Sequence, residues 1–145
     1  MCHKVNKLFL DFSRLVKERA SAFKEQLNNG CFVRIISHLD ADGITSASIM
    51  AKAIEREGNK YALSTVHQMS SELINELKQE KYGCYVFTDI GSSVVSDINE
   101  MLKGKKVFIL DHHSIEGITN AGNIVFVNPH TCGIDGGGGI SGAGV

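Results

Sequence analysis

Residues 32–43 read FVRIISHLDADG, and in this stretch a short apolar run ends abruptly in a pair of aspartates. Residues 84–89 (CYVFTD) and residues 106–113 (KVFILDHH) repeat the pattern. Apolar runs of this length, rich in β-branched and aromatic residues and separated by helix-length segments, are typical of buried parallel strands. In an open parallel sheet, ligands bind at the carboxyl ends of the strands. The pattern therefore predicts one edge that gathers several aspartates and histidines.

The predicted edge has the composition of a metal site. Crowded carboxylates raise one another's pKa values, and no Lys or Arg adjoins these aspartates in the sequence, so divalent cations would compensate their charge. Aspartate oxygens with one or two imidazoles suit Mn²⁺ or Mg²⁺ better than a thiolate-bound zinc. The structural alternative is that each aspartate is a helix N-cap, but the D-x-D-G and D-H-H patterns together favour metal. The residues expected at this edge are His38, Asp40, Asp42, Asp89, Asp111, His112 and His113.

Along the rest of the chain, segments whose apolar residues recur at helical spacing alternate with short apolar segments typical of strands. This alternation with short connections predicts an α/β fold, a parallel doubly wound sheet with flanking helices. We expect helices over residues 6–28, 44–58, 70–81 and 92–102, and strands over residues 31–37, 61–66, 84–88, 106–110 and 123–127.

Composition bounds the class of protein. The chain has 145 residues, 43% of them hydrophobic and 21% charged, which is typical of one globular domain. A formal charge of −1 gives no overall basic field for nucleic acid, although bound cations would reverse the sign of the cleft. No apolar run is long enough to span a membrane, and no secretion signal opens the chain. Four cysteines without C-x-x-C spacing fit a reduced compartment, and we expect a cytoplasmic protein.

The individual residues are assigned different roles. Asp89 follows the strand next to the D-x-D-G loop, and its two oxygens could bridge two cations. Of the adjacent histidines, His112 is expected to bind metal, and His113 to contact the phosphate or developing charge, because neighbours on an extended chain point apart. Asp111 could bind metal or hold a histidine tautomer. His38 could bind metal or be a loop histidine that bonds to the backbone.

These motifs resemble the DHH phosphoesterase family, and in particular its RecJ-like single-strand nuclease branch. The resemblance rests on residues 37–46 (SHLDADGITS), Thr88-Asp89, Asp111-His112-His113, residues 128–130 (NPH) and residues 141–145 (SGAGV). It covers nearly the whole chain from residue 32. The spacing of the histidine two residues before the first aspartate favours the RecJ-like branch over the family's pyrophosphatases, where the spacing is four.

The resemblance implies a hydrolase, a phosphodiesterase with two Mn²⁺ or Mg²⁺ ions that acts as an exonuclease on single-stranded DNA or RNA. It implies catalytic roles for Asp89, His112 and His113. It implies a DHH catalytic domain over residues 31–145, preceded by residues 1–30, where the helical spacing of apolar residues predicts an N-terminal amphipathic helix. The family's fourth motif and its C-terminal substrate-binding domain have no counterpart here, so we expect this chain to be part of something longer. The family's first three metal motifs match Asp40 with Asp42, Asp89, and Asp111-His112-His113. Together with the analysis of the individual residues, the expected metal ligands are His38, Asp40, Asp42, Asp89, Asp111 and His112.

Two other functions stay open from the sequence. One is a phosphoesterase for small substrates such as pyrophosphate, short oligonucleotides or cyclic dinucleotides. The other is a non-catalytic scaffold of a replication complex, since some relatives keep the fold and lose the metal chemistry. The expected partners are single-stranded nucleic acid and replication or repair proteins, with no membrane.

Overall fold

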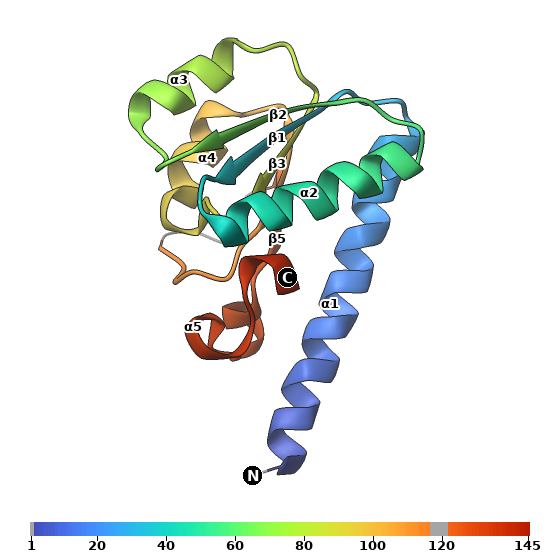
Figure 1. The fold of residues 1–145 in the computed structure, drawn as a ribbon, viewed down its shortest axis with the longest axis vertical. Helices are drawn as coiled ribbons and strands as arrows, with labels where there is room; N and C mark the ends of the chain where they lie inside the picture. Colours follow the sequence, from blue (N-terminus) through green and yellow to red (C-terminus); the bar gives the residue numbers. More distant parts are fainter. Residues whose placement is uncertain (1, 117–121) are drawn as a thin grey trace.

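One parallel five-stranded sheet organises the molecule (Figure 1). The computed structural model describes residues 2–116 and 122–145. The sheet has the order β2-β1-β3-β4-β5, and every neighbouring pair is parallel, which confirms the predicted fold class. The strands are β1 (Val33–His38), β2 (Tyr61–Val66), β3 (Cys84–Thr88), β4 (Lys106–Leu110) and β5 (Ile124–Val127).

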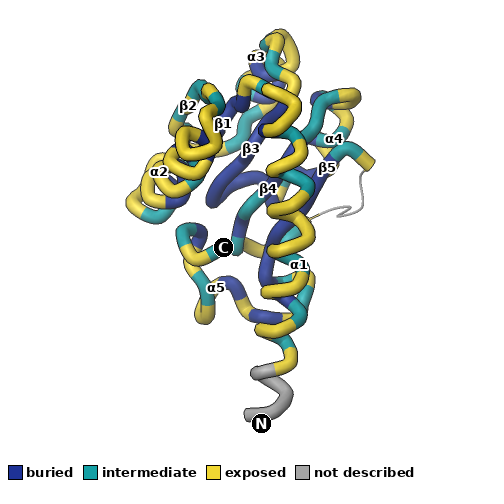
Figure 2. Tube along the Cα trace, turned by 90° about the vertical axis from the view of Figure 1, so that its right-hand side faces the viewer, coloured by how far each residue is buried: buried dark blue, intermediate teal, exposed yellow. Residues whose placement is uncertain are grey.

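Helices cover both faces of the sheet, as in a doubly wound fold. The main helices are α1 (Cys2–Asn28), α2 (Ala41–Arg56), α3 (Ser71–Gln79) and α4 (Val95–Met101). On the face covered by α1 and α2, Ile54 packs in the same core cluster as Val86, and on the face covered by α3 and α4, Ile98 packs with Phe87. The residues of β1, β3, β4 and β5 between these layers are mostly buried, whereas the edge strand β2 is half-buried or exposed (Figure 2).

Short elements follow the sheet at its carboxyl edge. They are η1 (Ser92–Val94), η2 (Pro129–Cys132), α5 (Gly136–Gly139) and η3 (Gly142–Gly144). Among the described residues, no helix is long and apolar enough to cross a membrane.

Helix α2 begins at Ala41, three residues before its predicted start. The reason is local, because the Asp40 carboxylate caps the helix and its Oδ1 accepts a hydrogen bond of 2.9 Å from the backbone N–H of Gly43. Asp42 therefore lies in the first turn of a helix, not on a loop. The other boundaries differ from the predicted ones by a few residues, and segment 92–102 divides into η1 and α4.

The strand order places a crevice between β1 and β3. The chain leaves β1 through α2 toward β2 on one side, and then returns through α3 to β3 on the other side of β1. The point where the order reverses is where ligands bind in open α/β sheets. Asp40 follows β1 and Asp89 follows β3, so both lie beside this crevice.

Buried hydrogen bonds hold the two strand ends together. The hydroxyl of Ser37 donates to the carbonyl of Gly43 at 2.7 Å and accepts from the hydroxyl of Thr88 at 2.9 Å. Gly43 also approaches the end of β1 so closely that a Cβ there would overlap the backbone carbonyl of His38. The start of α2 is thereby fixed against β1 and β3.

Gly43→Ala is expected to destabilise the protein by about 1–3 kcal/mol, because the added methyl group meets backbone atoms that have little freedom to move. Gly83→Ala is the matched control, since a Cβ at Gly83 has no neighbour within 4 Å among the described residues. Urea denaturation of both variants measures the difference. Equal stability of the two variants would contradict the close packing of α2 on β1.

Candidate metal centre

The Asp89 carboxylate occupies the middle of the crevice. Its residue is only 2% exposed, and its backbone has φ of 58°, the only positive φ of a non-glycine residue in the described ranges. Aspartate tolerates this left-handed conformation better than most residues. The turn brings the side chain under α2 while the backbone N–H still donates to the carbonyl of Leu110 at 2.9 Å. Asp89 therefore faces the residues that follow β1 and β4 together.

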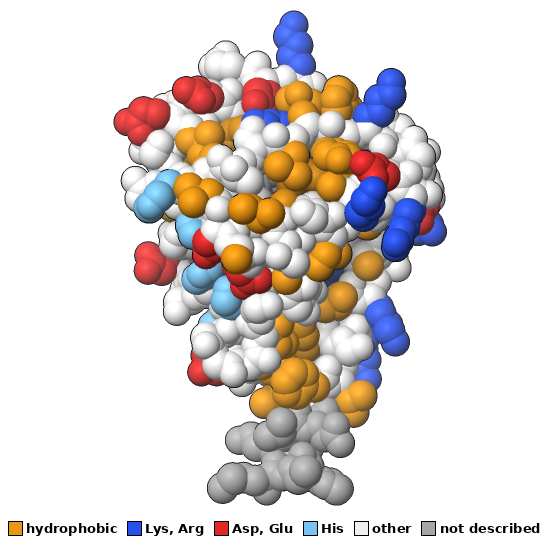
Figure 3. Space-filling view, in the orientation of Figure 1, with side chains coloured by type: hydrophobic (Ala, Val, Ile, Leu, Met, Phe, Trp, Pro, Cys, Tyr) orange, Lys and Arg blue, Asp and Glu red, His pale blue; other side chains and the backbone are white. Residues whose placement is uncertain are grey.

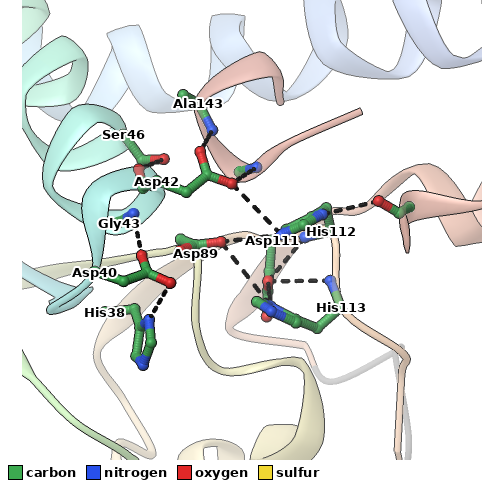
Figure 4. Close-up of polar contacts among 12 residues, drawn as sticks. His38, Asp40, Asp42, Gly43, Ser46, Asp89, Asp111, His112, His113 and Ala143 are labelled. Atoms are coloured by element: carbon green, nitrogen blue, oxygen red, sulfur yellow. Dashed lines mark hydrogen bonds and ion pairs between the residues drawn. The ribbon is translucent and has the colours of Figure 1, made fainter. Parts of the chain in front are cut away.

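Two groups of possible metal ligands share Asp89 (Figure 4). In the first group, Asp89 Oδ1 lies 3.2 Å from His112 Nε2 and 4.0 Å from His113 Nδ1. The second group joins Asp89 to His38 and Asp40. In each group the ligand atoms lie within 4.8 Å of one another, a spacing that one cation could span. The structure thus brings five of the seven predicted site residues into two adjoining groups.

Two buried polar atoms in the second group lack a hydrogen-bond partner among the described residues, Asp89 Oδ1 and His38 Nδ1. Each is near an oppositely charged or polar atom, His38 Nδ1 at 3.0 Å from Asp40 Oδ2, but without hydrogen-bond geometry. Buried polar atoms without partners cost free energy. A divalent cation coordinated by both atoms would remove this cost, and this oxygen-rich donor set with imidazole fits Mn²⁺ or Mg²⁺.

The electrostatics of Asp89 point the same way. Burial, reinforced by the nearby negative charge of Asp42, raises the pKa of Asp89 to about 6. By contrast, the N–H of Gly43 holds the pKa of Asp40 below its ordinary value. A carboxylate that is costly to ionise in the metal-free fold is a favourable ligand, because a cation stabilises the ionised form.

Asp42 connects the site to the last described residues. Its Oδ2 accepts from the backbone N–H of Gly142 at 2.7 Å, and its Oδ1 accepts from that of Ala143 at 2.8 Å. A Cβ at Gly142 would overlap the carboxylate of Asp89, so only glycine fits there. Asp42 belongs to neither group of three, although its Oδ2 lies 3.7 Å from His112 Nε2.

Asp111 makes the contacts of a residue that positions others. Its Oδ2 accepts from the N–H of Ser92 at 2.9 Å, and its Oδ1 accepts from the N–H of His112 at 2.8 Å and lies 2.7 Å from His113 Nδ1. Burial opposes ionisation, but these hydrogen bonds outweigh it and hold the pKa of Asp111 below its ordinary value. These bonds fit the second of the two roles that the sequence left open for Asp111.

The glycine-rich segment orients His112. The carbonyl of Gly136 lies 2.9 Å from His112 Nδ1, and since a carbonyl only accepts, Nδ1 carries the proton and Nε2 faces Asp89. The N–H of Gly136 in turn donates to His130 Nε2 at 3.3 Å. Burial lowers the pKa of His112, but the Gly136 carbonyl and the charge of Asp89 outweigh it and raise that pKa. Sequence reasoning missed this contact, whose only signal was the run of glycines.

The two adjacent histidines do not point apart as expected. Their ring centroids are 4.4 Å apart, and both rings lie beside Asp89. The expectation assumed an extended chain, but β4 ends at Leu110 and the backbone bends at His113. His67 and His130, two further histidines, lie outside both groups.

Asp89→Asn is expected to raise the thermal stability of the metal-free protein at about pH 7.5. The pKa of Asp89 is about 6 in the folded state, above its ordinary value of 3.8. Ionisation therefore costs folding free energy, and this cost grows as the pH rises from about 3.8 to about 6. Asparagine does not ionise and accepts a positive φ. Thermal melts in EDTA should show the variant melting higher at about pH 7.5 and the difference vanishing near pH 4. A melting temperature of the variant below that of the wild type at the higher pH would refute the conclusion that ionisation of Asp89 destabilises the metal-free fold.

Asp111→Asn is expected to act in the opposite direction and to lower stability by roughly 2 kcal/mol or more, because hydrogen bonds to a buried charge are lost. The depressed pKa means that this contribution is present above about pH 4 and lost below it. Urea denaturation as a function of pH measures it. The exposed Asp97→Asn is the control, and equal effects at the two positions would argue against the role given to Asp111.

Comparison with known proteins shows the family to which this chain belongs. The model of the DHH family, N-terminal domain, matches residues 32–145. An uncharacterized protein of Methanocaldococcus jannaschii is 34% identical over 137 residues. That match covers 90% of this chain and 31% of the archaeal protein, so the chain spans less than a third of its relative's length.

Three solved structures share the fold. RecJ of Thermus thermophilus in complex with Mn²⁺ is 22% identical with a TM-score of 0.71, over 90% of this chain and 19% of RecJ. An exonuclease RecJ bound to manganese is 24% identical with a TM-score of 0.72, over 88% of this chain and 34% of the exonuclease. CDC45 of Entamoeba histolytica is 19% identical with a TM-score of 0.62, over 77% of this chain and 24% of CDC45. These likenesses concern the fold, whereas the family match covers the strands and the residues of the site, and it shows that the chain belongs to the DHH family.

Proposed function

We propose that this chain carries the two-metal centre of a phosphodiesterase that acts on single-stranded nucleic acid. The observation that carries the proposal is that Asp89 belongs to both groups of possible ligands, so that one buried carboxylate lies between two cation positions. In two-metal phosphoesterases the ions lie roughly 3.5–4 Å apart, a distance that a shared carboxylate can bridge. The two RecJ structures that share the fold contain Mn²⁺, which supports the choice of metal.

The residues of the site would divide the work between them. His38 and Asp40 would hold one ion and His112 the other, with Asp89 shared between them and Asp42 Oδ2 lying 3.7 Å from His112 Nε2. When bound, two such ions lower the pKa of a water molecule and neutralise charge on the phosphoryl oxygens.

The remaining polar contacts would orient this set. Gly136 fixes the His112 tautomer so that Nε2 is free to bind metal. Asp111 holds the ring of His113 through Nδ1, which would place His113 to contact the phosphate. Asp111 is thereby proposed as a positioning residue, although the family resemblance also allows it to be a ligand.

The family resemblance adds the finer part of the proposal. It implies an exonuclease of RecJ type, with cutting from the 5′ end, in a protein longer than this chain that also carries a substrate-binding domain. A role as a non-catalytic scaffold is disfavoured. Family members that act as scaffolds tend to lose the acidic motifs, whereas in this chain the carboxylates of these motifs converge on one crevice. Replication or repair proteins stay proposed partners.

Mn²⁺-dependent hydrolysis of a 5′-labelled single-stranded oligonucleotide tests the proposal. Loss of even an outer partner of a metal ligand costs about 10- to 100-fold, so Asp89→Asn should lower the rate by roughly 100-fold or more. Asp97→Asn, an exposed aspartate on α4, is the matched control and should retain the full rate.

Two results would contradict the proposal. Near-normal hydrolysis by Asp89→Asn would refute the bridge, and no cleavage with or without Mn²⁺ would refute nuclease activity of this chain. Rates compared across oligonucleotide lengths separate a strand nuclease from a small-substrate phosphoesterase, which should prefer dinucleotides or pyrophosphate.

A further inference from the structure

A cleft of about 190 Å³ opens beside the candidate metal centre. Part of its lining consists of site residues, among them His38, Asp89 and His113. The rest of its lining comes from residues 67–69, between β2 and α3, and from the segment 90–93 that follows Asp89. Pockets for a drug-sized ligand measure roughly 300–1,000 Å³, so this cleft has room for one ring-sized group next to the metal positions.

The part of the cleft that lies outside the metal centre does not have the chemistry of a phosphate site. Among the described residues that line the cleft, none is Lys or Arg. On the face drawn in Figure 3, the histidines gather with acidic side chains on one side, while most Lys and Arg side chains lie on the other. A second phosphate of pyrophosphate would need cationic donors there. The lining therefore favours a group without charge.

The side chains of this part of the lining can bind a flat, uncharged ring. His67 is exposed at the end of β2, and its ring centroid lies 6.3 Å from that of His38, with the two planes at 75°. Met69 packs against the core cluster that contains Ile90, and both residues line the cleft. Histidine rings and apolar side chains are surfaces on which unpaired bases stack. Gln68 and Ser93 add hydrogen-bonding groups at the rim.

We propose that this part of the cleft, lined by His67, Met69 and Ile90, seats one nucleobase of the substrate while its phosphodiester lies at the metal centre. The inference rests on the proposed function and narrows its substrate to nucleotide esters, with inorganic pyrophosphate excluded. His67 is a specificity residue in this account and not a metal ligand.

Three dinucleotides test the proposal with Mn²⁺: an intact one and two that each lack one base. Removal of one of the two bases should lower kcat/KM about tenfold in the wild-type protein, since stacking of a base contributes roughly 1–3 kcal/mol. His67→Ala should lower kcat/KM for the intact dinucleotide by the same factor, mainly by raising KM. In this variant, removal of that base should cause no further loss of kcat/KM. Mn²⁺ binding should be unchanged.

Thr65→Ala, at an exposed residue of β2 two positions before His67, is the matched control and should behave as the wild type. Equal rates on all three dinucleotides in the wild type would overturn the base seat and leave the proposed function standing. Hydrolysis of pyrophosphate faster than that of the intact dinucleotide would also overturn it.

A binding measurement decides the inference even if no dinucleotide is hydrolysed. With Mg²⁺ present, adenosine 5′-monophosphate should shift the Cε1–H resonance of His67, assigned by its absence in His67→Gln, and ribose 5-phosphate should not. The same shift with both compounds, or none with either, would overturn the base seat independently of catalysis.

Discussion

The buried carboxylate of Asp89 is the constraint on which the rest of the site depends. It directly follows the central strand β3 in a left-handed backbone conformation, with one oxygen that has no hydrogen-bond partner among the described residues. The fold places it between the start of α2 and the residues after β4, so both sets of possible ligands reach the same carboxylate. Without a cation this arrangement costs stability, and with one it becomes a bridging ligand.

Two neighbouring strands end in the same residue type, yet the two aspartates have opposite properties. Asp111 is surrounded by N–H donors from Ser92 and from the chain that follows it, and its pKa is lowered. Asp89 lacks such donors and faces another carboxylate, and its pKa is raised. When environments separate the pKa values of like groups in this way, their roles separate as well. Asp111 stabilises the fold and orients a histidine, while Asp89 is left to bind metal.

Local sequence determines much of this architecture. The apolar runs predict the parallel strands, and the aspartates converge because the carboxyl ends of parallel strands share one edge. Contacts between distant segments could not be predicted in this way. Asp42 bonds to Gly142, a hundred residues along the chain, and the Gly136 carbonyl bonds to His112. Sequence periodicity predicts the face on which a residue lies, but not which distant loop packs over that residue. For the same reason, the sequence could not predict that His67 lines the cleft.

Anomalous diffraction from crystals grown with Mn²⁺ locates the ions and therefore shows whether Asp89 lies between two of them. We expect two peaks roughly 3.5–4 Å apart, one on each side of the Asp89 carboxylate, with His38 and Asp40 at one peak and His112 at the other. A single peak that does not contact Asp89, or ions held by Asp111 in its place, would contradict this expectation.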